Sequence, residues 1–130
     1  MDTLIDRQKL LKRLSYLIIL IFIFNLVAGK LYWYSSIWWF DMPMHFLGGV
    51  WVGLILIYLF RVHGLSNKTI LGLLLGVLLV GVGWEFFEFA FVNPIAGNPF
   101  NTLDTLSDIF FDLAGGAFAL LYFLKRIVIQ

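Results

Sequence analysis

The sequence predicts an all-α integral membrane protein, a four-helix bundle with both termini in the cytoplasm. Of its 130 residues, 62% are hydrophobic and only 13% are charged, against roughly 25% charged in soluble proteins. Four apolar stretches approach the ~20 residues that a membrane-spanning helix needs. The basic residues gather at one side of these stretches. A chain this small could not hide so much apolar surface from water, so the membrane is its expected solvent.

We expect one transmembrane domain covering residues 1–130. Its spans are predicted at about residues 14–34, 42–60, 70–92 and 104–124. The breaks between them are rich in turn-forming residues: Ser35-Ser36, His63-Gly64, and the Asn/Pro/Gly-rich run from Asn93 to Asn101. The first stretch is expected to be a span, because its apolar run is too long for a cleaved signal peptide.

The orientation follows from lysine and arginine. Eight of the nine basic residues fall on one side of the four-span arrangement, and Lys30 falls on the other; the eight are Arg7, Lys9, Lys12, Arg13, Arg61, Lys68, Lys125 and Arg126. Basic residues favour the cytoplasmic side. The pattern therefore predicts a multi-pass protein of the inner (cytoplasmic) membrane, with the aromatic residues Tyr32–Tyr34 and Trp38-Trp39 at the outer interface.

Several classes of site are excluded by composition. The chain has no cysteine, which rules out disulfides, thiolate metal sites and cysteine nucleophiles. It has no basic face beyond the short ends of the apolar runs, so nucleic acid is not an expected partner, whereas membrane lipids are. No organic cofactor motif is present.

Glycine spacing indicates close helix packing. Gly49 and Gly53 are four residues apart, as are Gly72 and Gly76, and Gly115 lies in the fourth span. Small residues let helix backbones approach one another in membranes. The third span carries glycines on two faces, which predicts that it lies at the centre of the bundle.

Acidic and imidazole groups on three spans are predicted to converge on the outer side of the membrane. Spacings of three and four residues place each set on one helix face. The seven residues are Asp41 and His45 on the second span, Glu85 and Glu88 on the third, and Asp104, Asp108 and Asp112 on the fourth.

This cluster contains six of the eight acids in the chain. A charge in the bilayer core costs roughly 2.5 to 3.5 kcal/mol even on the lenient insertion scale, so such groups need partners. The acids must therefore hold protons, cations or both. A divalent metal is the leading expectation: carboxylates with one imidazole suit Mg²⁺, Mn²⁺ or Ca²⁺ and also admit Zn²⁺ or iron. Six acids exceed the needs of one ion, so a metal pair is also open.

Four of the seven have local explanations as well. Asp41 precedes Met42-Pro43 and fits a helix N-cap. Asp104 could complement a helix dipole, Glu88 could lie among the headgroups, and His45 could be a packing residue. Glu85, Asp108 and Asp112 lie too deep for capping.

The order of these motifs resembles a known family. Asp41-x-x-x-His45-Phe46, then Trp84-Glu85, then Asp104-Thr105-x-x-Asp108 with Gly115 is similar to the YjdF-like inner-membrane proteins and, more distantly, to the VanZ-like proteins. The resemblance covers about residues 41 to 118. It implies a fold and a set of motif residues but no reaction.

The leading functional hypothesis is a metal-dependent hydrolase or transferase open to the outer leaflet, acting on a lipid-linked phosphate. Its catalytic residues are left unassigned. Two alternatives stay open: a proton- or cation-coupled transport component, with assembly into a homo-oligomer, and an accessory subunit with a structural metal site.

Overall fold

A computed structural model describes residues 4–129, and four long helices account for most of this range. The long helices are α1 (Arg7–Lys30), α3 (Asp41–Leu59), α4 (Asn67–Phe87) and α6 (Thr102–Tyr122). The shorter elements are β1 (Leu4–Ile5), α2 (Trp33–Ser36), the π-helical η1 (Glu88–Val92), α5 (Asn93–Ala96), the π-helical η2 (Phe123–Ile127) and β2 (Val128–Ile129). The predicted all-α membrane bundle is confirmed, because four helical segments are long and apolar enough to cross a membrane.

Several helix boundaries differ from the predicted spans, and two of these differences have a local cause. The first helix begins at Arg7 rather than near residue 14, because the Asp6 side chain caps it by accepting from the Lys9 amide at 2.9 Å. The third helical segment continues to Ala96 instead of ending at residue 92. Pro94 does not interrupt it, because the π-helical η1 directly precedes α5, and local π-helical turns allow a membrane helix to accommodate proline. Gly97, with φ of +71°, ends the segment.

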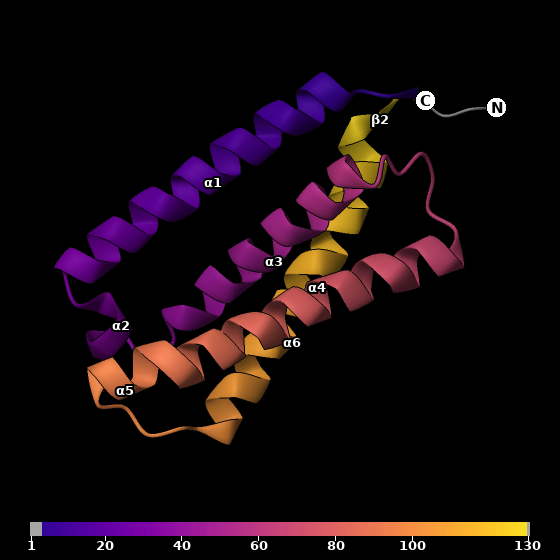
Figure 1. Ribbon diagram of the computed structural model, residues 1–130. Coiled ribbons are helices and arrows are strands. Elements are labelled where there is room, and N and C mark those ends of the chain that lie inside the picture. Colours follow the sequence, from indigo (N-terminus) through magenta and orange to yellow (C-terminus); the bar gives the residue numbers. More distant parts are fainter. Residues whose placement is uncertain (1–3, 130) are drawn as a thin grey trace.

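Helix α3 lies at the centre of the bundle and packs against α1, α4 and α6. Figure 1 shows α1 and α4 on different sides of α3, with α6 behind it. The prediction of a central third span, α4, is therefore wrong. One glycine that suggested it, Gly72, faces open space, and only Gly76 and Gly81 approach neighbouring side chains.

Glycines allow α3 and α6 to cross at short range. A methyl group on Gly49 would collide with the backbone carbonyl of Asp112, and one on Gly115 would collide with the backbone carbonyl of Phe46. A methyl group on Gly53 would lie 2.8 Å from Cβ of Ala119. These contacts place the backbones of α3 and α6 against each other along the shared face.

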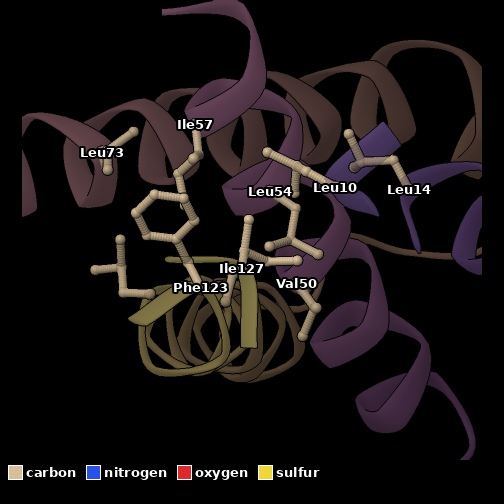
Figure 2. Close-up of a cluster of buried hydrophobic side chains, with 10 residues drawn as sticks. Leu10, Leu14, Val50, Leu54, Ile57, Leu73, Phe123 and Ile127 are labelled. Atoms are coloured by element: carbon tan, nitrogen blue, oxygen red, sulfur yellow. The ribbon is translucent and has the colours of Figure 1, made fainter. Parts of the chain in front are cut away.

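The end of the bundle where β1 and β2 lie is closed by apolar packing. β1 and β2 pair antiparallel there, which ties the start of the chain to its end. Figure 2 shows the buried side chains of this region: Leu10, Leu14, Val50, Leu54, Ile57, Leu73, Phe123 and Ile127. We call this end the basic end, because it also holds the first turns of α1, the α3–α4 loop, the first turn of α4 and η2, which carry the eight basic residues. α2 and α5 lie at the opposite end (Figure 1).

Candidate metal centre

We call the opposite end of the bundle the acidic end. His45 contacts three of its carboxylates. It lies one turn into α3 and is 8% exposed, while Asp108 and Asp112 on α6 are 2% and 8% exposed. Its Nε2 atom lies 3.7 Å from Oδ2 of Asp41 and 3.7 Å from Oδ2 of Asp108. Its Nδ1 atom lies 3.1 Å from Oδ1 of Asp112. Both ring nitrogens therefore face carboxylates, two at Nε2 and one at Nδ1.

The Asp112 contact gives the two ring nitrogens different roles. We assign the proton to Nδ1, because a carboxylate beside it accepts a hydrogen bond. In the neutral imidazole, the Nε2 lone pair then points at the carboxylates of Asp41 and Asp108. Three negative or electron-rich groups meeting at one point require a cation or an additional proton between them. One ligand atom from each of Asp41, His45 and Asp108 lies within 4.8 Å of the others, and we call these three residues the triad.

Local sequence explains why these groups meet. Asp41 and His45 are four apart on α3, and Asp108 and Asp112 are four apart on α6, so each pair shares one face of its helix. The glycine contacts bring these faces together. Gly81 on α4 completes the fit, because a methyl group there would lie 2.6 Å from Oδ2 of Asp112.

The capping explanation for Asp41 is wrong. Phe40 is the N-cap of α3, and no side chain caps this helix. Asp41 is the first helical residue, and its carboxylate faces His45 one turn along the helix. A carboxylate there still complements the positive end of the helix dipole.

The remaining three predicted residues lie around a separate cavity of about 280 Å³. We call it the mouth cavity. Its carboxylates are Glu85, Glu88 and Asp104, and it is also lined by the amides of Asn93, Asn98 and Asn101 and by Thr105. The group of mutually close ligand atoms found among the described residues does not include Glu85, Glu88 or Asp104. The seven predicted residues therefore divide into the triad, its partner Asp112, and three acids of the mouth cavity.

Two of these acids differ in how they are satisfied. Oε1 of Glu88 accepts a hydrogen bond of 2.8 Å from the Trp84 indole. Oε1 of Glu85 is buried and, among the described residues, has no hydrogen-bond partner. A buried acceptor without a partner costs roughly 1 to 3 kcal/mol unless a ligand or water satisfies it.

Tyr34 of α2 also lies near the acidic end, and the sequence placed it only in an aromatic belt. Its hydroxyl donates to Oδ1 of Asn25 at 2.7 Å. Burial first, then the charges of Asp41 and Glu88, raise the pKa of Tyr34 to about 12. The phenol therefore stays protonated at physiological pH. No residue spacing signals the contact between Tyr34 and Asn25, because it depends on how the chain turns between α1 and α2.

Within the described chain, acids dominate one end of the bundle and basic residues dominate the other, except that Lys30 ends α1 on the acidic side. Every ion pair of the acidic cluster there runs to His45. Basic side chains instead make contacts at the basic end: Nζ of Lys9 donates to the Arg126 carbonyl, and the Arg7 guanidinium lies 4.5 Å from the Tyr58 ring centre.

These features define a small polytopic membrane protein with a carboxylate and imidazole cluster at one end of its helices. The chain belongs to the family described as Predicted membrane protein (DUF2238), whose family model matches residues 3–127. This confirms the resemblance to the YjdF-like proteins, which are this family; the more distant resemblance to the VanZ-like proteins stays a prediction. Comparison with curated proteins and with solved structures gave no match.

Proposed function

We propose that this protein is a membrane metalloprotein in which Asp41, Nε2 of His45 and Asp108 bind one divalent cation. Asp112 is a positioning residue that fixes the His45 tautomer. The observation that carries the proposal is the convergence of two carboxylates on the Nε2 side of a histidine whose Nδ1 is held by a third. Carboxylate–histidine–metal arrangements use this pairing to orient the ring and raise its basicity.

The spacing of the triad suits a shared ion. Metal–ligand bonds of roughly 2.0 to 2.6 Å allow two ligand atoms to lie up to about 5 Å apart across one ion. The triad atoms lie within 4.8 Å of one another, so small side-chain adjustments bring them to bonding distance. One imidazole and two carboxylates suit Mn²⁺, Zn²⁺ or Fe²⁺, with Mg²⁺ and Ca²⁺ as harder alternatives. A single ion is favoured over the pair, because the other acids line the mouth cavity.

A bound ion with three protein ligands keeps coordination positions for water and substrate. Such an ion activates water and polarises a phosphoryl or acyl oxygen. We therefore propose a metal-dependent hydrolase or transferase whose substrate is a lipid-linked phosphate, since the ion attracts an anionic group that the carboxylates alone repel. A transport pathway is less favoured, because buried apolar side chains fill the interior at the basic end.

The orientation is part of the proposal. The eight basic residues at the basic end favour the cytoplasmic side of the inner membrane, which places the triad toward the outer leaflet. Reporter domains fused after Gln130 and inserted at Gly97 should report opposite sides. Two reports from the same side would reverse this assignment.

Metal analysis of matched variants tests the proposal. Wild-type protein purified without added metal should carry close to one ion per chain, and a chelator should lower its melting temperature. Asp108→Asn should remove most of the bound metal. Asp6→Asn is the matched control: it removes one acid at the basic end, and asparagine caps a helix as well as aspartate does. It should keep the metal.

Two results would overturn the metal site. One is an Asp108→Asn protein that binds as much metal as the Asp6→Asn protein. The other is a wild type that holds no metal and does not respond to chelator. In that case a proton among His45, Asp41 and Asp108 would take the place of the ion, and proton transfer would become the working hypothesis.

A further inference from the structure

The mouth cavity offers hydrogen-bonding groups of both kinds that the protein itself leaves unused. Oε1 of Glu85 is buried and has no partner among the described residues. Glu88 commits one oxygen to Trp84. Oδ1 of Asn101 accepts from the amides of Leu103 and Asp104 as the N-cap of α6, so its NH₂ group remains for a ligand.

The lining selects against two kinds of ligand. Glu85, Glu88 and Asp104 contribute carboxylates, and no lysine or arginine lines the cavity. An anionic group such as phosphate would be repelled. A bare cation would pair with the carboxylates but would make no use of the NH₂ donors of Asn93, Asn98 and Asn101. The matching ligand both donates and accepts hydrogen bonds, as hydroxyl groups do.

The cavity also has an apolar wall. Phe89 of η1 and Phe100 of the following loop line it, and their rings pack edge to face with centres 5.6 Å apart. Carboxylates, amides and aromatic rings together fit a sugar ring, whose edge carries hydroxyls and whose face carries C–H groups. At about 280 Å³, the cavity is close to the lower end of the range for small-molecule sites, roughly 300 to 1,000 Å³.

The cavity is adjacent to the triad along α6. Asp104 and Thr105 line the cavity. Asp108 of the triad follows Asp104 by four residues and Thr105 by three, so it lies on the same helix face. We propose that the mouth cavity binds a hydroxyl-rich, sugar-like group of the substrate whose linkage the triad holds. This inference rests on the proposed function. A lipid-linked sugar phosphate combines both requirements, with its phosphate at the ion and its sugar in the cavity.

The test uses chelator-treated full-length protein in phosphatidylcholine vesicles, so that the triad does not attract phosphate. The probe is monoglucosyl diacylglycerol, and the comparison lipids are phosphatidic acid and phosphatidylethanolamine, which carry an anionic and an ammonium headgroup. Retained lipid is measured by native mass spectrometry. We expect selective retention of the glucosyl lipid. Equal retention of either comparison lipid would overturn the proposal.

Variants then locate the binding. Asn98→Ala and Glu85→Leu should each bind the glucosyl lipid about tenfold more weakly, because each removes a hydrogen-bonding group from the cavity. Asn67→Ala, at the far end of α4, is the matched control and should bind normally. Asn98 lies in a loop, so Asn98→Ala does not disturb the helices. Unchanged binding by both cavity variants would overturn the proposal.

Two further measurements separate the sources of the ligand and the two hypotheses. Competition by free methyl glucoside would identify a soluble sugar as sufficient, whereas a requirement for the acyl chains would identify a lipid; either supports the hydroxyl-rich class. Metal content is measured on the same variants before chelation and should be unchanged. Bound metal without glucosyl binding defeats only this inference, and glucosyl binding without metal defeats only the metal centre.

Discussion

The two ends of the bundle are held together by different kinds of contact. At the basic end, Leu10, Ile57 and Phe123 are almost fully buried among other apolar side chains, and the strands β1 and β2 pair there. At the acidic end, the buried polar groups at the α3–α6 contact are His45, Asp108 and Asp112. Apolar packing needs only shape, whereas a buried polar group costs free energy unless it has a partner.

This difference indicates that one end of the bundle serves stability and the other end serves ligand binding. The basic end supplies packing that does not depend on a ligand, so it can hold α1, α3 and α6 together while the acidic end keeps polar groups available. Damage to the basic end should therefore lower stability and spare ligand binding. Damage to the acidic end should weaken ligand binding and leave the stability of the metal-free protein unchanged. Three predictions test this separation.

The largest expected effect is on stability, from Phe123→Ala at the basic end. Phe123 is fully buried, and truncating a buried phenylalanine costs about 3 to 5 kcal/mol. The melting temperature in detergent should fall strongly, while the metal content of the folded protein at low temperature should not change. Leu124→Ala is the control, because Leu124 is 42% exposed to the surroundings of the bundle. Loss of metal with retained stability would contradict the proposed separation.

The sequence predicted the four helices and the location of the acids because these depend on local rules. Apolar length identifies a span, and spacings of three or four residues identify a helix face. These rules placed Asp41 beside His45 and Asp108 beside Asp112 on their own helices. They also brought both pairs to the same end of the bundle.

The division of the cluster could not be predicted, because it depends on how helices cross. Glycine contacts between α3 and α6 direct Asp112 to Nδ1 and Asp108 to Nε2 of the same ring. Glu85 lies on α4. The continuation of that helix through η1 and α5 brings the loop that contains Asn98 to the mouth cavity, which Glu85 also lines. Helix crossings and the path of a loop are long-range properties that a single sequence pattern does not contain.

The second prediction is a loss of metal affinity in Asp112→Asn without a loss of fold. The amide can donate to Nδ1 and so favour the proton on Nε2, which blocks the lone pair that we assign to the metal. Removing a positioning partner of this kind typically weakens metal binding by about 10- to 100-fold. Calorimetric titration with Mn²⁺ or Zn²⁺ measures the change, and the metal-free melting temperature should stay near that of the wild type. Wild-type affinity in this variant would refute the positioning role.

The smallest expected effect is a change in the pKa of Tyr34, which reports on the acidic end from outside the membrane spans. Burial is the main cause of its raised pKa of about 12, and the charge of Asp41 adds to it. In metal-free protein, Asp41→Asn should therefore lower the pKa of Tyr34 only part of the way toward the ordinary value of 10. The raised pKa means that the folded protein holds this proton more tightly than the unfolded chain. The resulting stabilisation is fully present below pH 10 and is lost as the pH rises toward 12.

A carbon-13 label on the tyrosine ring, assigned with Tyr34→Phe, follows the titration by NMR. A metal ion bound at Asp41 should lower the same pKa, because it places positive charge where the carboxylate stood alone. If neither Asp41→Asn nor added metal moves the Tyr34 titration, the phenol does not sense the triad, and the proximity of α2 to the acidic end is wrong.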